Sequence, residues 1–496
     1  GLLDYDKEDT YFKDLQFRFY YLLQKYAIEK VNIEPLQFFK HRPDNFPTIR
    51  LSQLASLYHQ EKNLFSFQDV LPDRKIQVDF NAPDISSNGG LVLVGLMKDS
   101  IARKIARLIP DYRNQLFVQH SYEEMVCQRV GQIMCGYEDA NDCDRLRHDS
   151  ALKMSVGRKA SDPGLCSQPT MTRLENHIDK RTLWKIAELF VKDYISSFDK
   201  APRKIILDVD DTNANTYGAQ QLSLFNDYYD EYCYMPMVIF DGMNGKLILP
   251  LLRPGRRNKS LNIFGILRRV IEYIHKEWPH TIIELRGDSH FCSHEFMDWV
   301  KTHLYVRFIT GLSGNPALMK KIDKQLRRAK GDFELHHEDV RRYYSFEYKA
   351  KSWKYRQRVI AKIEVSDKGV NVRFIVTSNR NNKPETVYRR YCKRGTMELW
   401  IKDLKYFRAD RMSCSSFRAN MFRLFLYGAA YVTAYRLRSK AFSNTEVGAF
   451  TMDSFMKRIM LSAVFIVEKK TFIRFSFSPH HRHLEALSQA LTRLSA

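Results

Sequence analysis

The chain has 496 residues, of which 44% are hydrophobic and 13% aromatic. This length and composition exclude wholesale disorder, collagen-like chains and low-complexity chains, and they predict two or three domains. The 79 Lys and Arg residues against 57 Asp and Glu give a net charge of +22, which favours a polyanionic partner such as nucleic acid. We find no apolar run of membrane-spanning length and no signal peptide, so we expect no membrane partner.

The eight cysteines form no CxxC pair. Their scatter argues against zinc knuckles and against a disulfide framework. We therefore expect reduced thiols and a cytoplasmic protein.

The first 75 residues differ from the rest in charge. They hold eleven Lys and Arg and eleven Asp and Glu, so the whole net charge lies in 76–496. A cluster of Pro and turn residues between Leu71 and Pro83 marks a boundary. We interpret 1–75 as a separate, mostly helical extension.

Apolar spacing of three and four residues predicts a helical region over 76–200. Within it, Ser167 can cap a helix that begins at Gln168 and has Pro169 in its first turn. The polar front of this helix, which includes Arg173, could enter a DNA groove, and a capped surface helix is the alternative that we favour for the segment taken alone. The longer helices are expected over 91–108, 120–134 and 183–195.

The pattern changes at residue 204 to strands that alternate with helices. Three strands precede a helix–strand–helix–strand order, which suits a mixed five-stranded sheet whose later strands run parallel to the first. The strands are expected over 204–210, 232–240, 246–252, 281–286 and 305–310, and the helices over 260–278 and 294–302.

A β-rich insertion interrupts this α/β pattern. It opens with a basic helix around 320–330, which could follow a DNA backbone or simply be solvated, and strand-like runs follow it. Those runs are 342–348, 359–365 and 370–377, and helices return over 393–407, 416–439 and 452–467. The predicted divisions are a 1–75 extension, a 76–200 helical DNA-binding region, an α/β core in two parts (201–314 and 386–440), a 315–385 β-rich insertion and a 441–496 helical region.

Acidic residues follow two strands that are predicted to be parallel. Asp208 and Asp210 share one face of the first strand, where two carboxylates repel each other unless a cation lies between them. Asp288 follows the later strand, and the carboxyl ends of parallel strands meet at one edge. Each acid taken alone is more often a turn former or a helix cap.

A polar stripe follows one side of a predicted helix near residue 400. At 100° per residue the stripe is flanked by an apolar face, and a solvated face with ordinary ion pairs explains it from periodicity alone. The stripe consists of Tyr391, Arg394, Glu398 and Lys405, and the apolar face of Met397, Trp400, Leu404 and Phe407.

These blocks together resemble a known family. Asp-x-Thr at 210–212, Gly-Asp-Ser-x-Phe at 287–291 and Tyr-x2-Arg-x3-Glu-x6-Lys at 391–405 resemble the three signature blocks of IS4-type DDE transposases. Further stretches resemble the IS1380 family of insertion-sequence transposases, so the resemblance covers about 76–475. These stretches are 135–142, 165–170 with 173–176, 252–255, 286–289 and 409–414.

The resemblance implies an RNase-H-like core of the retroviral-integrase type. It implies that Asp210, Asp288 and Glu398 are a catalytic triad that holds two Mg²⁺ ions, for which Mn²⁺ can substitute. Asp210 is preferred to Asp208 because it matches Asp-x-Thr, and Asp208 remains the reserve candidate. His290 departs from the family, which often has Gly or Ala there.

The resemblance also implies an activity and its partners. Such a transposase binds double-stranded DNA at terminal inverted repeats, cleaves it and joins the 3′-OH ends to target DNA, as a homodimer on paired ends in the bacterial nucleoid. Tyr391, Arg394 and Lys405 would hold DNA near the cut. Trp353 is a candidate for holding a flipped base, and packing of the insertion's small core explains it equally well.

Two other functions remain open. The chain could be a catalytically silent DNA-binding derivative of a transposase, or a metal-dependent nuclease of the same fold that does not join strands. Separately, residues 42–55 resemble part of an unrelated, uncharacterised bacterial family, which makes 1–75 a candidate for a fused foreign fragment.

Overall fold

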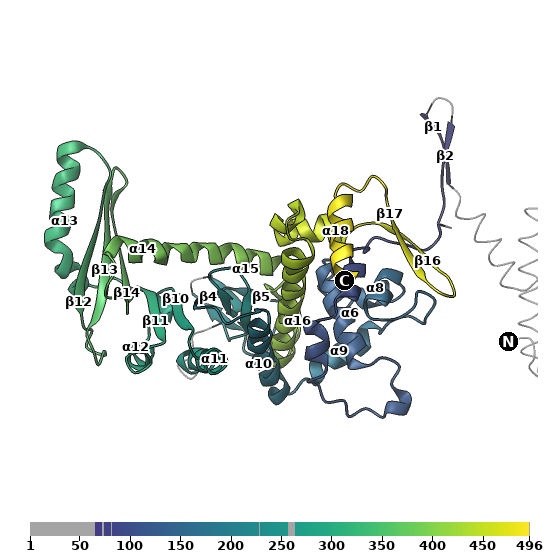
Figure 1. Cartoon of the computed structure of the whole chain (residues 1–496), viewed down its shortest axis with the longest axis horizontal. Coiled ribbons are helices and arrows are strands. Elements are labelled where there is room, and N and C mark those ends of the chain that lie inside the picture. Colours follow the sequence, from purple (N-terminus) through teal and green to yellow (C-terminus); the bar gives the residue numbers. More distant parts are fainter. Residues whose placement is uncertain (1–64, 72–73, 81, 228, 256–262, 496) are drawn as a thin grey trace, which may run out of the picture. The chain divides into compact units, whose positions relative to one another are not determined.

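The computed structural model describes residues 65–71, 74–80, 82–227, 229–255 and 263–495 (Figure 1). The chain divides into two compact units, Gly1–Ala82 and Pro83–Ala496. In the first unit, β1 (Phe65–Leu71) pairs antiparallel with β2 (Arg74–Val78). These strands differ from the mostly helical extension that we predicted over 1–75, and the rest of that extension lies outside the described residues.

The second unit contains the predicted mixed sheet. On one side of β4, β10 pairs with it in parallel, and β11 pairs in parallel with β10. On the other side, β8 pairs antiparallel with β4, and β9 pairs antiparallel with β8. This arrangement confirms the predicted order of the five core strands. Their bounds are β4 (Lys204–Asp211), β8 (Met237–Asp241), β9 (Leu247–Leu251), β10 (Ile282–Gly287) and β11 (Val306–Leu312).

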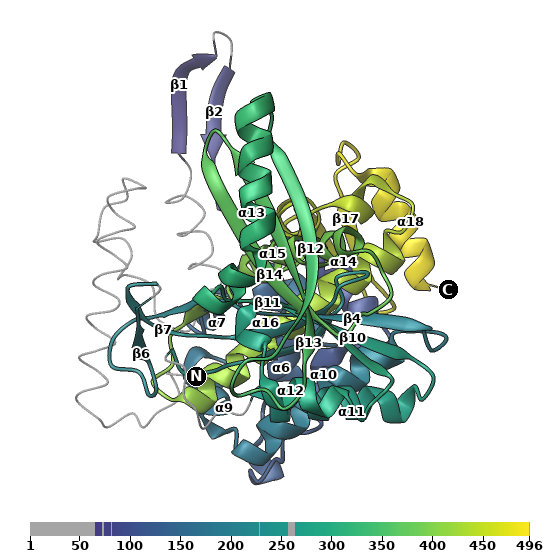
Figure 2. The ribbon, with the colours of Figure 1, turned by 90° about the vertical axis from the view of Figure 1, so that its left-hand side faces the viewer.

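The sheet has eight strands rather than the predicted five, because the insertion extends it. The strands β12 (Val340–Tyr348), β13 (Gln357–Ser366) and β14 (Gly369–Thr377) form an antiparallel set, and β14 pairs with the outer edge of β11. This pairing satisfies backbone groups of β11 that would otherwise be left at a sheet edge. The basic helix α13 (Pro316–His336) packs on β12 and β13 (Figure 2).

The predicted strand over 232–240 is in fact two strands. Its first part is β7 (Glu231–Tyr234), which lies in a separate small sheet, and Pro236 separates it from β8. Proline lacks the N–H that a continuing ladder needs, so the chain changes sheets there. The other strands of the small sheet are β5 (Ala214–Thr216), β6 (Leu224–Asn226) and β15 (Arg411–Met412).

Helices dominate 91–196, as predicted. The predicted helix over 91–108 is broken into α4 (Leu91–Leu96) and α5 (Ile101–Ala106), because the side chain of Ser100 accepts from the backbone N–H of Arg103 and starts a new helix. The other helices are α6 (Tyr122–Met134), α7 (Asp142–Leu146), α8 (Ser150–Ser155), α9 (Gln168–His177) and α10 (Lys180–Ser196).

The predicted helix over 452–467 is wrong at its end. Helix α17 (Met452–Phe455) continues as a wider π turn to Met460, after which β16 (Val464–Glu468) pairs with β17 (Ile473–Phe477) and with β3 (Ile85–Ser86). The run Val-Phe-Ile-Val is rich in residues that favour strands. Only α18 (Leu484–Ser495) is helical beyond this hairpin within the described residues.

Helix α16 (Phe417–Arg436) is the central element of this unit. It is buried on nearly all sides and contacts α6, α9, α10 and β9 (Figure 1). Phe425 stacks on Phe190 of α10 with ring centroids 5.6 Å apart. A helix that is apolar all round is expected in a core, and none of the helices in the described part of the chain is suited to cross a membrane.

We predict opposite effects of alanine at two glycines. A Cβ on Gly255 would overlap the carbonyl oxygens of Cys233 and Leu224, whereas one on Gly331, inside α13, meets nothing within 4 Å. Gly331→Ala should therefore raise the free energy of unfolding by about 0.5–1 kcal/mol, and Gly255→Ala should lower it. Urea denaturation of both variants measures this, and a destabilised Gly331→Ala would contradict the helix.

Candidate active site

Two aspartates emerge together at the carboxyl ends of parallel strands. The register places Asp208 opposite Arg286 and Val209 opposite Gly287, so that Asp210 and Asp288 follow side by side. Burial raises the pKa of Asp210 to about 6, Arg394 opposes this rise, and the negative charge of Asp288 adds to it. The two carboxylates therefore interact across the strand ends.

Asp208, the alternative candidate for the first catalytic acid, is fully buried, and both of its carboxylate oxygens are hydrogen-bonded. Both of its oxygens accept from Arg286, with Nε–Oδ1 at 2.5 Å and Nη2–Oδ2 at 2.6 Å. Burial raises the pKa of Asp208, and Arg286 opposes the rise. Arg286 also donates from Nη1 to the carbonyl oxygen of Arg390 at 2.7 Å. This pair therefore holds β4, β10 and the segment that carries Tyr391 and Arg394 together.

Each aspartate near the end of β4 pairs with an arginine from a different segment. These charges would repel one another without such partners. Only the pair at Asp210 leaves the carboxylate and the guanidinium partly exposed, at 17% and 19%. The pairs are Asp208 with Arg286, Asp210 with Arg394 (Nη1–Oδ2 2.6 Å) and Asp211 with Arg253.

Both ends of the polar stripe lie beside strands of the sheet. The hydroxyl of Tyr391 lies beside Gly311 of β11, where a Cβ would come within 2.9 Å of it. At the other end, Lys405 donates from Nζ to Oδ1 of Asn213 at 3.0 Å, just beyond β4. Burial raises the pKa of Tyr391 and lowers that of Lys405. The predicted apolar face is confirmed, with Met397, Leu404 and Phe407 buried.

Glu398 is not brought into contact with the two aspartates. It is exposed in the first turn of α15 (Thr396–Tyr406). The stripe was predicted on an unbroken helix, but α14 (Pro384–Cys392) is joined to α15 by a 3₁₀ turn over Lys393–Gly395, which changes the angle between successive residues. Among the residues that the structure describes, no three His, Cys, Asp or Glu side chains gather closely enough to hold a metal ion.

The donor chemistry of the paired acids nevertheless fits a divalent cation. Asp210 and Asp288 present hard carboxylate oxygens, which Mg²⁺ prefers, and it needs few protein ligands because it keeps several waters. A cation near them would also relieve the repulsion from Asp288, which adds to the rise that burial causes in the pKa of Asp210.

Two predicted DNA contacts lie elsewhere. Arg173 is exposed on α9, and it donates within its own helix to the carbonyl oxygen of Pro169 and to Oγ1 of Thr170. Trp353 lies between β12 and β13, is only 8% exposed, and packs edge to face on Tyr348 at 5.5 Å. The structure therefore places Trp353 in the core of the insertion rather than on its surface.

Sequence reasoning gave no role to two residues beside the acids. Arg253 belongs to the Leu252–Gly255 stretch that we quoted for the resemblance, and the structure pairs it with Asp211. His290 was noted only as a departure, and its Nδ1 lies 3.1 Å from Oδ2 of Asp288. The two stretches were the only signals for these residues.

Three other quoted stretches meet away from the acids. Glu138, Glu175 and Arg411 come from separate stretches and join one network of ion pairs. Arg411 pairs with Glu138 at 2.7 Å, and the buried Arg129 of α6 pairs with Glu175 of α9 at 3.2 Å. These contacts fix the helical region against the segment that follows α15.

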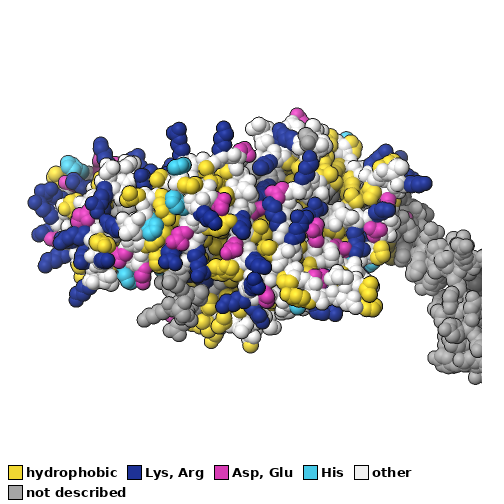
Figure 3. Space-filling view, turned by 60° about the horizontal axis from the view of Figure 1, so that its bottom comes forward, with side chains coloured by type: hydrophobic (Ala, Val, Ile, Leu, Met, Phe, Trp, Pro, Cys, Tyr) yellow, Lys and Arg dark blue, Asp and Glu magenta, His cyan; other side chains and the backbone are white. Residues whose placement is uncertain are grey.

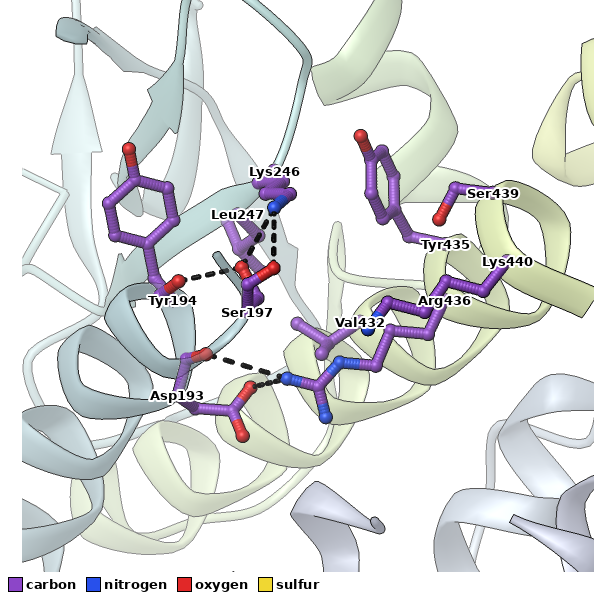
Figure 4. A pocket seen from close by; sticks show the side chains of 10 residues that line it. All are labelled: Asp193, Tyr194, Ser197, Lys246, Leu247, Val432, Tyr435, Arg436, Ser439 and Lys440. Carbon is purple, nitrogen blue, oxygen red and sulfur yellow. Dashed lines mark hydrogen bonds and ion pairs between the residues drawn. The ribbon is translucent and has the colours of Figure 1, made fainter. Parts of the chain in front are cut away.

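A small pocket lies at the other end of β8 from Asp210, between α10, β9 and α16 (Figure 4). Lys246 donates from Nζ to the carbonyl oxygen of Ser197 at 3.1 Å, and Arg436 pairs with Asp193. Lys246, Arg436 and Asp193 are thus engaged with the pocket's own walls. We therefore place the candidate site at the paired acids and not at the pocket.

Many basic side chains lie on the insertion, at one end of the unit Pro83–Ala496 (Figure 3). Residues 315–385 carry 18 Lys and Arg against 9 Asp and Glu, and the basic residues of α13 point into solvent. The exposed ones on α13 are Lys320, Lys321, Lys324, Arg327, Arg328 and Lys330.

The family model described as "Transposase DDE domain group 1" matches residues 68–496. The chain belongs to this family of DDE transposase domains. A model described as a protein of unknown function (DUF2851) matches residues 1–78. The comparison with curated proteins gives no match. Among solved structures, the chain is similar to a piggyBac transposase in a synaptic complex with hairpin DNA, at 11% identity and a TM-score of 0.44 over 75% of this chain and 79% of that chain.

The two aspartates of β4 should respond differently to amidation. Asp208→Asn leaves the buried Arg286 without its counter-charge and should lower the free energy of unfolding by about 3–5 kcal/mol. Asp210→Asn removes a carboxylate whose charge is opposed by burial, and it should change stability by less than about 1 kcal/mol or increase it. Urea denaturation at pH 8 measures both values, and equal losses would contradict the assignment of Asp208 as structural.

The raised pKa of Asp210 should also make the free energy of unfolding depend on pH. The folded pKa of Asp210, about 6, is above its ordinary value of 3.8, so the folded state holds the proton more tightly. The stability of the wild type relative to Asp210→Asn should therefore fall as pH rises from about 4 to about 6 and stay level above that. A difference that grows with pH across this window would show that Asp210 is stabilised as the carboxylate.

Proposed function

We propose that this DDE transposase domain acts on DNA as the transposase of an insertion sequence of the IS1380 type. It would bind terminal inverted repeats, cleave phosphodiester bonds at the element ends and join the 3′-OH ends to target DNA. The observation that carries the proposal is the juxtaposition of Asp210 and Asp288 at the strand ends, with the helix that bears Glu398 lying alongside. An RNase-H-like core is part of the proposal, and the order of the five central strands supports it.

In this proposal three acids hold two Mg²⁺ ions, for which Mn²⁺ can substitute. When bound, the ions would supply an activated water and a stabilised leaving oxygen. Asp210 and Asp288 would hold them from the strand ends, and Glu398 would complete the ligand set from α15. Glu398 lies four residues after Arg394, which contacts Asp210, and its carboxylate would have to turn toward the acids to bind the ions.

Arg394 would act as a phosphate ligand as well as the partner of Asp210. Its guanidinium is only 2.6 Å from Asp210 and remains partly exposed. The forked donors of Arg394 suit a DNA phosphate and would contact it once the pair with Asp210 opens. Lys405 would make a second phosphate contact, and Tyr391 would stack on or hydrogen-bond a nucleotide beside Asp288.

The rest of the DNA would follow the basic surfaces. The exposed residues of α13 suit backbone contacts, which depend on charge and not on sequence. Arg173, exposed on α9, would contact the terminal repeat, and Trp353 would support the insertion or reach a flipped base after a rearrangement. A homodimer on paired ends in the bacterial nucleoid would bring the two cuts together.

The segment 1–75 would be a fused fragment of a different gene. Its net charge of zero and the separate family match over 1–78 support this. Independent copies of the transposase that carried the same residues would contradict the fusion.

One assay separates the proposal from its alternatives. The full chain is incubated with Mg²⁺, a labelled terminal-repeat duplex and a target plasmid. We expect joined product. Cleavage without joining would indicate a nuclease of the same fold, and a bound but uncut duplex would indicate a catalytically silent derivative.

Asp288→Asn should abolish cleavage and leave DNA binding largely intact, because it removes a metal ligand and no basic side chain. The matched control is Asp298→Asn on α12 (His294–Val300), which should cleave like the wild type. Gel electrophoresis of cleaved ends and a mobility-shift titration measure the two properties. Wild-type turnover by Asp288→Asn would refute the assignment.

A further inference from the structure

His290 holds the carboxylate of Asp288 at both oxygens. Its backbone N–H donates to Oδ1 of Asp288 at 2.8 Å, and its imidazole Nδ1 lies 3.1 Å from Oδ2. A hydrogen on Nδ1 makes the second contact a donated hydrogen bond to the carboxylate. One residue therefore engages both potential metal-binding oxygens of Asp288.

The two contacts do different things to Asp288. The backbone contact is a helix cap, because Asp288 caps the 3₁₀ turn Ser289–Phe291, and it fixes the direction of the side chain. Rotation of a carboxylate about its last bond is soft, so a single hydrogen bond leaves the plane of the group loosely defined. The imidazole contact fixes that plane.

The imidazole of His290 lies among the acids of the site and is not part of the buried core. About a third of the His290 side chain is exposed, and its Nδ1 lies 3.9 Å from Oδ2 of Asp211. Asp211 is itself paired with Arg253. The partly exposed His290 ring therefore lies at the edge of the acidic cluster and contributes little to the core.

We propose that His290 is a positioning residue of this site: its imidazole N–H orients the carboxylate of Asp288 for the divalent cation. This inference rests on the proposed function. Groups that orient a metal ligand are typically worth tenfold to a hundredfold in metal affinity or activity, so removal of the imidazole should cost about that factor.

The test uses three variants of the full chain. His290→Ala removes the donor, His290→Asn places an amide N–H near the position of Nδ1, and His294→Ala makes the same truncation four residues further on, on α12. The measurements are the cleavage rate, the Mg²⁺ concentration that gives half the maximal rate, the affinity for the terminal-repeat duplex, and the thermal midpoint.

We expect His290→Ala to lower the cleavage rate and to raise the required Mg²⁺ concentration, by about tenfold to a hundredfold in all, with unchanged DNA affinity. His290→Asn should recover most of this loss, and His294→Ala should match the wild type. The inference is overturned when His290→Ala behaves like the wild type, or when His290→Asn is as defective as His290→Ala.

Failure of the inference is distinct from failure of the proposed function. An inactive Asp288→Asn together with a fully active His290→Ala removes the role of His290 only. An active Asp288→Asn removes the site itself.

Discussion

The buried pair between Asp208 and Arg286 is the interaction on which the site depends. Both side chains are removed from water, so each charge is tolerated only because the other lies within hydrogen-bonding distance. The third bond of Arg286, to the carbonyl oxygen of Arg390, attaches the segment that carries the polar stripe to the same point. Two parallel strands and the third signature block are thereby fixed at one buried position.

The acidic side chains become more exposed with distance from that buried pair. The Asp208 side chain is fully buried, Asp211 is 7% exposed, Asp210 17% and Asp288 26%. The inner acids are paired with the buried Arg286 and Arg253, whereas the outer two contact the partly exposed Arg394 and His290. A site of this kind separates the charges that stabilise the fold from the charges that are available for chemistry.

Much of the central fold could be predicted from local pattern. The five core strands followed from apolar runs, although one run also included β7, and their order predicted the meeting of Asp210 and Asp288. The pairing of β14 with β11 could not be seen, because it joins residues more than sixty positions apart in the chain. The apolar run at 464–467 is too short for its spacing to distinguish a helix from a strand, and its pairing with β3 and β17 joins segments that apolar spacing does not connect.

The site was predicted less completely than the fold. The register of β4 and β10 accounts for Asp210 and Asp288, but Arg253 arrives from a chain segment whose path no periodicity reveals. The contact of His290 with Asp288 depends on the 3₁₀ turn Ser289–Phe291, which apolar spacing does not predict. Glu398 shows the limit most clearly. A single 3₁₀ turn over Lys393–Gly395, between α14 and α15, alters the helical phase on which the four-residue stripe was predicted.

The central claim is that Glu398 joins Asp210 and Asp288 around divalent cations when DNA is bound. The most direct test is a crystal structure of the full chain with pre-cleaved terminal-repeat DNA and Mn²⁺, with the metal located by its anomalous scattering. We expect Mn²⁺ bound by Asp210 and Asp288, with Glu398 turned inward and Arg394 moved to a phosphate. Mn²⁺ held by other residues, or Glu398 still in solvent beside an unbroken Asp210–Arg394 pair, would contradict it.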